Sequence, residues 1–339
     1  MEKIKSVFFG TPQFAVPSLK RLLSHTDFAV VAVVTQPDKR RGRGGKVTPS
    51  PVKTAAVEAD CSIFQPARIK KDDDTLAKLA AMKADAFVVI AYGQILSQTI
   101  LDMPRLGCVN AHGSILPEYR GAAPIQWCIH DGVTTTGVTT MLMDAGMDTG
   151  PMLVKETIAI GLSENAWDVA AKLSELSADL LVTTLQKLQQ QQIQPVPQDN
   201  EQATYASLIK KEDYTLDWKK SAKAIHDKVR GFYPNCVTSF REGALKVSKT
   251  APLGDEYWTQ LPEAVAKAQP LYTAATIEQS AAPGTIVAIL KNYGPVIQTG
   301  EGHLLLCEVK PAGKKALSGW DFANGSRLQV GEVLGASAQ

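Results

Sequence analysis

The sequence offers little that could anchor the chain in a membrane. No apolar run in its 339 residues approaches the ~20 residues needed to cross a bilayer. The N-terminus, Met1–Lys5, is charged and lacks the apolar stretch and small-residue cleavage site of a signal peptide. With 45% hydrophobic and 21% charged residues, the composition is typical of a soluble globular protein. We therefore expect a cytoplasmic protein with no membrane partner.

Cysteine is scarce and scattered. The five cysteines are odd in number and far apart, and no CxxC or Cys/His spacing indicates zinc or a disulfide framework. Cys108 and Cys128 lie in apolar stretches, which favours buried and inert thiols. We therefore expect no bound metal.

Glycine is missing where a dinucleotide-binding loop would need it. The first turn, Phe9–Phe14, has one glycine where that fingerprint requires three. Pro12 also removes a backbone amide that could face a phosphate. The turn argues against a nicotinamide cofactor.

The first two hundred residues alternate apolar runs with helical patterns. Continuous apolar runs are typical of strands covered on both faces of a sheet. We expect strands at Ser6–Phe9, Phe28–Thr35, Ala86–Tyr92, Gly107–His112 and Gly137–Met143, and helices at Pro17–Ser24, Pro51–Ala59, Asp73–Met82 and Pro124–His130. This alternation predicts an α/β fold with a doubly wound, mostly parallel sheet.

A long helix and a linker follow. Ser163 is the expected N-cap, and apolar residues then recur at three- or four-residue steps as far as Leu188. The run Gln189–Pro197 is polar and punctuated by proline, which is typical of a linker. We therefore expect two domains, residues 1–205 and 206–339.

The sequence pattern of the second domain differs from that of the first. Short strand candidates are separated by glycine-rich breaks, which predicts a small barrel or sandwich. The segment Pro252–Pro283 carries few signals. We expect a helix at Ala222–Val229 and strands at Cys236–Phe240, Ala244–Ser248, Thr285–Ile289, Pro295–Gln298 and Leu304–Val309.

Polar side chains gather at the end of the strand Gly107–His112. Open α/β sheets bind their ligands at the carboxyl ends of strands. Asn110 and His112 are two residues apart, so in an extended chain their side chains point to the same side. An amide donor beside an imidazole suits the stabilisation of negative charge on a carbonyl oxygen. Hydrogen bonds to nearby backbone are an equally weighted alternative.

A second polar loop, Asp144–Gly150, follows the strand Gly137–Met143. Its glycines allow a tight turn. Asp148 is positioned in sequence to pair with His112 and fix its tautomer, whereas Asp144 can simply form the turn. No nucleophile is evident, because Ser114 lacks a GxSxG setting and no cysteine stands near a histidine. Direct transfer therefore fits better than a covalent enzyme intermediate.

Several runs of the sequence together resemble those of methionyl-tRNA formyltransferases. The Asn110/His112/Asp148 set alone would indicate only the wider group of folate-dependent formyltransferases. A basic loop after Thr35, Asp38–Lys53, and the second domain narrow the resemblance to the enzymes that act on tRNA. The matching runs are Phe9–Pro12, Thr35–Asp38, Asn110–His112, Ser114–Pro117, Arg120–Gln126, Thr140–Gly150 and Gly319–Phe322, so the resemblance covers essentially the whole chain.

The resemblance implies a Rossmann-like formyltransferase domain and a reaction. The donor would be the co-substrate 10-formyltetrahydrofolate, and the acceptor the α-amino group of methionyl initiator tRNA, giving formylmethionyl-tRNA for translation initiation. Asn110, His112 and Asp148 would be the catalytic residues. The reduced folate would contact Gln94, Ile95, Leu96, Ser114, Ile115, Leu116, Pro117 and Asp144.

The resemblance also implies how tRNA is bound. The basic loop would reach the acceptor end of the tRNA through Arg40, Arg41, Arg43 and Lys46. We favour Arg43, which has glycine on both sides, followed by Arg41. The C-terminal domain resembles an oligonucleotide-binding barrel, with Lys210, Lys211, Lys246 and Lys249 as candidate contacts. A monomer is the default expectation.

Three alternatives remain open at this point. A formyltransferase for a small amine would share the catalytic set without needing the basic loop or the second domain. A 10-formyltetrahydrofolate hydrolase would replace the amine with water. A nucleic-acid-binding protein with a degenerate α/β domain would not need Asn110, His112 and Asp148 together.

Overall fold

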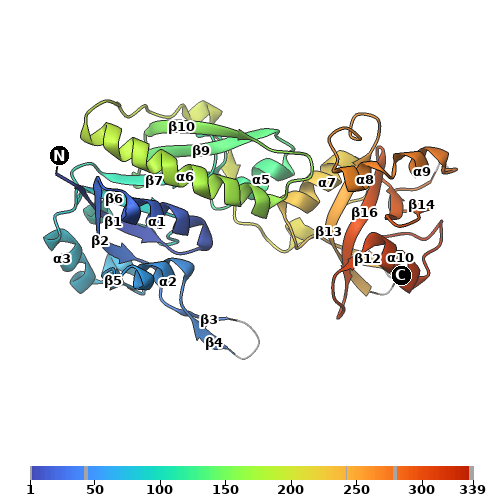
Figure 1. Cartoon of the computed structure of the whole chain (residues 1–339), viewed down its shortest axis with the longest axis horizontal. Coiled ribbons are helices and arrows are strands. Elements are labelled where there is room, and N and C mark those ends of the chain that lie inside the picture. Colours follow the sequence, from blue (N-terminus) through green and yellow to red (C-terminus); the bar gives the residue numbers. More distant parts are fainter. Residues whose placement is uncertain (1, 42–44, 242, 278–280, 336–339) are drawn as a thin grey trace. The chain divides into compact units, whose positions relative to one another are not determined.

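The chain forms two compact units in the computed structural model (Figure 1). The structure describes residues 2–41, 45–241, 243–277 and 281–335. The first unit comprises Met1–Pro124, Thr136–Ile158 and Ala170–Ala206, and the second comprises Ile125–Thr135, Ala159–Val169 and Ser207–Gln339. Two short segments ahead of residue 206 therefore group with the second unit. The division into folding domains at 205–206 stays a prediction.

A seven-stranded sheet forms the centre of the first unit, in the order β10-β9-β7-β6-β1-β2-β5. From β5 to β7 all neighbours are parallel, and β9 runs antiparallel to β7. The prediction of a doubly wound, mostly parallel sheet is confirmed. The strands are β1 (Ile4–Gly10), β2 (Phe28–Val34), β5 (Ile63–Phe64), β6 (Ala86–Ile90), β7 (Cys108–His112), β9 (Thr135–Leu142) and β10 (Met152–Ala159).

Burial explains why β1, β2, β6, β7 and β9 were predicted from the sequence, whereas the two-residue strand β5 was not. All five residues of β6 are buried, and so are all of β1 except Lys5. The chain adds β2 and β5 on one side of β1 and then β6 and β7 on the other. This reversal of strand order creates the crevice at which open α/β sheets bind ligands. The edge strand β10 was not predicted, because it is half exposed and its centre is Lys155–Thr157.

Helices and short pairings complete the first unit. The helical elements are η1 (Gln13–Ala15), α1 (Val16–Ser24), α2 (Pro51–Glu58), η2 (Ile69–Lys71), α3 (Asp73–Ala81), α4 (Gln98–Leu101) and η3 (Asn200–Gln202). Two small sheets stand apart from the central one. They pair β3 (Lys39–Arg41) with β4 (Lys46–Thr48), antiparallel, and β8 (Arg120–Gly121) with β11 (Tyr205–Ala206), parallel.

The long helix α6 (Ala166–Gln189) begins later than predicted. Asn165, rather than Ser163, provides its cap. The Asn165 side-chain oxygen accepts hydrogen bonds from the amides of Trp167 (2.8 Å) and Asp168 (3.3 Å). The Asp168 carboxylate in turn accepts from the Asn165 amide at 3.0 Å, which completes a capping box. In the described part of the chain, α6 and every other helix are too short or too polar to span a membrane.

The second unit is built on an antiparallel sheet in the order β12-β13-β16-β15-β14. Residues near the C-terminus bridge both edge strands, since Leu334 pairs with Phe240 of β12 and Val333 pairs with Thr285 beside β14. These bridges close the sheet in the manner of a barrel. The strands are β12 (Val237–Phe240), β13 (Gly243–Leu253), β14 (Ile286–Leu290), β15 (Gly294–Gln298), β16 (His303–Pro311) and β17 (Leu317–Ser318).

The helices of the second unit cover this sheet. The predicted helix near Ala222–Val229 is α7, and α8 and α9 occupy the segment that carried few signals. Their apolar faces join the buried cores that include Phe232, Trp258 and Phe322. The helical elements are α5 (Pro124–His130), η4 (Glu212–Tyr214), α7 (Ala222–Gly231), α8 (Glu263–Ala266), α9 (Gln269–Ala274) and α10 (Gly319–Ser326).

Candidate active site

Asn110 and His112 lie on β7, between the parallel strand β6 and the antiparallel strand β9. Asn110 stands opposite Met141, and His112 stands opposite Thr139. The alternation of a strand sends both side chains to one face and Ala111 to the other. Within the described residues the half-buried Asn110 amide has no hydrogen-bond partner, so its N–H groups are available to a ligand.

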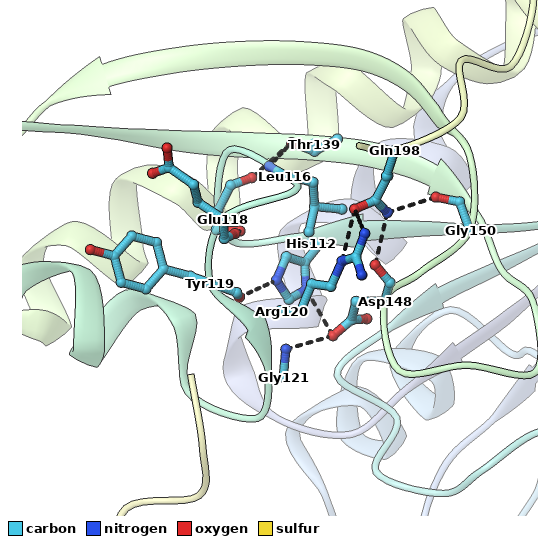
Figure 2. A network of polar contacts seen from close by, with 11 residues as sticks. His112, Leu116, Glu118, Tyr119, Arg120, Gly121, Thr139, Asp148, Gly150 and Gln198 are labelled. Atoms are coloured by element: carbon cyan, nitrogen blue, oxygen red, sulfur yellow. Dashed lines mark hydrogen bonds and ion pairs between the residues drawn. The ribbon is translucent and has the colours of Figure 1, made fainter. Parts of the chain in front are cut away.

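Each ring nitrogen of buried His112 faces a different acceptor (Figure 2). Nε2 lies 2.9 Å from the Tyr119 carbonyl oxygen. Because a carbonyl can only accept, Nε2 carries a hydrogen. Nδ1 lies 3.6 Å from Asp148 Oδ2, which is longer than a hydrogen bond. Nδ1 is therefore the nitrogen that can take up or release a proton.

Asp148 is delivered by the loop that connects β9 and β10. Its backbone adopts a left-handed conformation (φ 54°), which is uncommon for a residue with a side chain. Its Oδ2 atom accepts a hydrogen bond from the Gly121 amide at 2.9 Å. Its backbone carbonyl accepts from Gln198 Nε2 at 2.8 Å. Several contacts from outside the loop thus hold the carboxylate beside the imidazole.

Asp144 acts within the same loop. Its Oδ1 atom accepts hydrogen bonds from the Gly146 amide (3.0 Å) and from the Thr149 hydroxyl (2.7 Å). The carboxylate therefore makes the turn, which is the alternative that its sequence context left open. Its contact with folate stays a prediction.

Thr139 of β9 holds the loop Ser114–Pro117 in place through two hydrogen bonds. The buried Thr139 hydroxyl donates to the Ser114 carbonyl (2.8 Å) and accepts from the Leu116 amide (3.0 Å). The Ser114 hydroxyl donates to the Glu118 carbonyl at 2.6 Å. Sequence reasoning missed Thr139, although a polar residue within a central strand needs a hydrogen-bond partner, which is a signal of this kind of role.

A cavity of about 300 Å³ opens beside Asp148, at the lower end of the range for small-molecule sites. Asp148 belongs both to this cavity and to the pair with His112, so the cavity reaches that pair. Much of its lining is apolar. The lining residues are Gln94, Ile95, Leu96, Met141, Met143, Asp144, Ala145, Gly146, Met147 and Asp148.

The predicted folate residues divide into two groups around this cavity. Gln94, Ile95, Leu96 and Asp144 line it, whereas Ser114–Pro117 do not. The Gln94 side chain accepts from the Ile69 amide (2.8 Å) and donates to the Pro66 carbonyl (3.0 Å). That leaves the backbone groups of Gln94 for a ligand. A role for Ser114–Pro117 in folate binding stays a prediction.

A buried arginine, which sequence reasoning did not single out, lies next to the site. Arg120 is 1% exposed, and its guanidinium donates twice to Gln198 Oε1 (3.0 and 2.8 Å) and once to Asn200 Oδ1 (3.0 Å). Gln198 Nε2 donates to the carbonyls of Asp148 (2.8 Å) and Gly150 (2.7 Å). Figure 2 shows Arg120 and Gln198 beside the His112–Asp148 pair.

The basic loop forms the β3–β4 hairpin, which Figure 1 shows extending from the end of β2. Its base is fixed by Asp38, which accepts from Lys53 Nζ (2.7 Å) and Gln65 Nε2 (2.8 Å). The hydrogen bond from Lys53 lowers the pKa of Asp38. The Arg40 side chain is exposed. Arg43 and the side chains of Arg41 and Lys46 lie outside what the structure describes.

Two further predictions concern lysines and metals. Lys210, Lys211, Lys246 and Lys249 are all exposed in the second unit, so their side chains are accessible to a partner. Over the described residues, no group of three or more His, Cys, Asp or Glu side chains is arranged to hold a metal ion.

Comparison with known families gives two matches. Residues 3–185 match the model described as formyl transferase, and residues 208–327 match the model of the formyl transferase C-terminal domain. Residues 186–207, including Gln198, lie between the two matched ranges.

Relatives are similar over nearly the whole chain. The methionyl-tRNA formyltransferase of Trichormus variabilis is 62% identical over 333 residues, covering 98% of this chain and 99% of the relative. That of Synechocystis is 55% identical and covers 96% and 99%. Among solved structures, the N-formyltransferase from Helicobacter canadensis, in complex with folinic acid and dTDP-3-aminofucose, has a TM-score of 0.61 at 18% identity. That match covers 90% of this chain and 98% of the other, and it concerns the fold.

Proposed function

The chain belongs to the methionyl-tRNA formyltransferase family, and we propose that it transfers the formyl group of 10-formyltetrahydrofolate to the α-amino group of methionyl initiator tRNA. The observation that carries the chemistry is the free Asn110 amide beside His112. It puts a hydrogen-bond donor on the same face of β7 as a nitrogen that can exchange a proton, and Asp148, which faces that nitrogen, also lines a ligand-sized cavity. Asn110, His112 and Asp148 are the proposed catalytic residues.

The reaction is an acyl transfer without an enzyme-bound intermediate. The amine nitrogen attacks the formyl carbon, and the formyl oxygen gains negative charge. The bond from that carbon to N10 of the folate then breaks, N10 takes a proton, and tetrahydrofolate leaves. The Asn110 N–H groups stabilise the oxygen as its charge grows, a contribution that is typically about 100–1,000-fold in rate.

His112 accepts the proton that the amine must lose, and Asp148 assists it. The attacking amine of an aminoacyl ester is substantially neutral near pH 7, because a reference α-amino group has a pKa of about 8. Strong base catalysis is therefore unnecessary. Nε2 is held by Tyr119, so His112 Nδ1 takes part in the transfer and Asp148 stabilises the imidazolium that results.

The cavity beside Asp148 is the proposed site of the folate. Its lining combines apolar side chains, such as Leu96 and Met141, with the polar groups of Asp144 and Asp148. A flat heterocycle with polar edges suits such a surface. Ile95 and Met147 are 76% and 66% exposed, so apolar surface at this cavity is available to a ligand.

The β3–β4 hairpin and the second unit are proposed to bind the tRNA. Arg40, Arg41, Arg43 and Lys46 are suited to phosphate contacts, which release counterions and weaken as salt rises. Affinity for methionyl-tRNA should therefore fall with ionic strength, while affinity for folate should not. We expect a monomer, which sedimentation would test. Because translation is initiated in the cytoplasm, the proposal places the protein there.

A formyl-transfer assay tests the proposal. Purified protein is given labelled 10-formyltetrahydrofolate and methionyl initiator tRNA, with uncharged tRNA, free methionine and no acceptor run in parallel. Label should appear only on methionyl-tRNA and should be largely lost with His112→Ala. His25→Ala is the matched control and should keep wild-type activity, since His25 is the C-cap of α1 and precedes the start of β2, at the end of the sheet opposite the carboxyl ends of its parallel strands.

Other outcomes would point to the alternatives. Formate released without an acceptor would indicate a 10-formyltetrahydrofolate hydrolase. Transfer to small amines alone would indicate a small-molecule formyltransferase and leave the basic hairpin without a role.

A further inference from the structure

We propose that residues 198–206, the connecting segment, position the catalytic pair His112–Asp148, with Gln198 as the principal positioning residue. This inference rests on the proposed function. The segment lies between the two ranges that match family models, and its neighbour Gln189–Pro197 has the composition of a linker. Its contacts nevertheless reach both members of the pair.

Gln198 uses every polar atom of its side chain. It is 9% exposed, and its two N–H groups are directed to the carbonyls of Asp148 and Gly150. Its oxygen accepts two hydrogen bonds from Arg120. No other natural side chain of this length offers two donors on one atom and an acceptor on its neighbour. Gln198 therefore ties the Asp148 loop directly to the strand β8.

Strand β8 carries the amide that holds the Asp148 carboxylate. It pairs with β11 of the connecting segment, and the Arg120 amide donates to the Thr204 carbonyl at 2.9 Å. Gly121 has φ +122°, and a Cβ there would lie 2.7 Å from the Ala206 carbonyl oxygen. The segment thus packs against the Gly121 backbone too closely for any side chain. That contact fixes the Gly121 amide, which donates to Asp148 Oδ2.

The same segment reaches the histidine through Tyr119. The Thr204 hydroxyl oxygen accepts from the Tyr119 amide at 2.8 Å. The Tyr119 carbonyl in turn accepts from His112 Nε2. Gln198 and Thr204 therefore act on the two members of the pair from opposite ends of one short segment.

Such support matters because the pair does not hold itself together. The 3.6 Å between Nδ1 and Oδ2 exceeds a hydrogen bond, so neighbours set the separation. Catalytic groups misplaced by ~1 Å commonly lose about 100-fold in rate. Loosening the connecting segment should therefore lower kcat without weakening the binding of either substrate.

Gln198→Leu tests the inference, with Gln194→Leu as the matched control. Gln194 lies four residues before Gln198, in the linker-like run Gln189–Pro197, and its side chain is exposed. We expect Gln198→Leu to lower kcat for methionyl-tRNA by about 10–100-fold, with KM for both substrates within about 3-fold of wild type. Gln194→Leu should match wild type. Unchanged kcat in Gln198→Leu would overturn the inference.

A double-substitution cycle separates positioning from a general structural role. If Gln198 acts through Asp148, then Gln198→Leu should cost less than about 3-fold in a protein that already carries Asp148→Asn. A full additional loss in that background would overturn the inference. An inactive wild-type protein would instead refute the proposed function, so the two failures are distinguishable.

If Gln198→Leu fails to fold, a second variant tests the positioning role of the segment. Thr204→Val keeps the shape of the side chain and removes the acceptor for the Tyr119 amide. We expect a smaller loss in kcat, about 3–10-fold, since this exposed hydrogen bond acts on His112 only through Tyr119. Thr204→Ser should restore the rate. Wild-type kcat in Thr204→Val would overturn the inference.

Discussion

Two buried histidines, one in each unit, share half of their environment and differ in the other half. His112 Nε2 donates to the Tyr119 carbonyl (2.9 Å), and His226 Nε2 donates to the Leu162 carbonyl (2.7 Å). At the other nitrogen, His226 Nδ1 accepts from the Thr250 hydroxyl at 2.9 Å. His112 Nδ1 instead faces the Asp148 carboxylate across 3.6 Å. One histidine is fully hydrogen bonded, and the other retains one reactive nitrogen.

The two buried arginines repeat this contrast. Arg230 binds the buried carboxylate of Asp227 (2.8 Å) and backbone carbonyls of Gly161 and Glu164. The Arg120 guanidinium binds the side-chain amides of Gln198 and Asn200, and no described carboxylate forms an ion pair with it. Its charge therefore remains a source of positive potential beside the active site.

On the proposed function, the same residue types serve structure in one unit and chemistry in the other. A structural cluster pairs every donor, acceptor and charge, because unsatisfied groups in the interior destabilise the fold. A catalytic cluster leaves selected groups unpaired and supports them from a second layer. In the proposed catalytic cluster, the groups that have no hydrogen bond among the described residues are the Asn110 amide and His112 Nδ1, and the support comes from Gln198, Gly121 and Tyr119.

The largest expected effect comes from replacing each of the two histidines with glutamine. The side-chain amide of glutamine keeps a donor like Nε2–H but has no counterpart of Nδ1. His112→Gln should lower kcat for formyl transfer by about 100–10,000-fold, because proton transfer is lost, and should leave the unfolding free energy nearly unchanged. His226→Gln should lower that free energy by about 1–3 kcal/mol, because Thr250 loses its partner, and should leave kcat unchanged. Activity assays measure kcat, and denaturant titrations measure the unfolding free energy, for both variants. Equal loss of activity in the two would break the comparison.

Methionine in place of each arginine should give the next largest difference. Arg230→Met leaves Asp227 buried with Lys223 as its remaining partner, so the unfolding free energy should fall by about 3 kcal/mol. Arg120→Met leaves only amide oxygens unpaired and should cost about 1–3 kcal/mol, but kcat should also fall. Denaturant unfolding and steady-state kinetics measure the two effects. A greater loss of activity in Arg230→Met would contradict the assignment of roles.

Gly121→Ala should damage the active site through the backbone. Alanine there would have to move the Ala206 carbonyl or leave φ +122°, and either change displaces the amide that holds Asp148. We expect kcat to fall by about 10–100-fold. Gly243→Ala is the control, since the nearest atom to its Cβ would be 3.8 Å away. Wild-type kinetics in Gly121→Ala would show that the close contact has no catalytic role.

The effect that develops most gradually is a pH dependence of stability from His226. Burial lowers the pKa of His226 to about 4 from its ordinary 6.5, and neighbouring Arg230 and Lys223 act in the same direction. Below pH 6.5 the unfolded chain binds a proton that the folded protein does not, so stability falls as pH falls towards 4. The slope from this group should be about 1.4 kcal/mol per pH unit, measurable by denaturant titration at several pH values. An unchanged slope in His226→Gln would contradict this origin.

The sequence predicted the sheet of the first unit well because burial on both faces imposes continuous apolar runs. It missed β10, an edge strand whose exposed Lys155 and Glu156 interrupt that pattern. It also shortened β13, whose eleven residues contain Pro252. Proline and alternating exposure are tolerated where neighbouring strands supply the packing, and that context is not local to the sequence.

The candidate site was predicted in part for a similar reason. His112 and Asp148 carry their chemistry in their residue types, and loop spacing brings them together. Gln198 has no such signal, since its effect arises from contacts with Asp148 and Arg120, 50 and 78 residues away. The residue type of Arg120 predicts an exposed side chain, since arginine is ordinarily exposed, whereas this arginine is buried.

The central claim is that Asn110 stabilises charge on the formyl oxygen, and Asn110→Ala tests it most directly. Within the described residues its amide has no hydrogen-bond partner, so its removal should not disturb the fold. The measurement is the single-turnover rate of label transfer from 10-formyltetrahydrofolate to methionyl-tRNA, with the Kd for folate determined on the same sample. We predict a rate lower by about 100–1,000-fold and a Kd within about 3-fold of wild type. A wild-type rate, or a loss explained entirely by weaker folate binding, would contradict the claim.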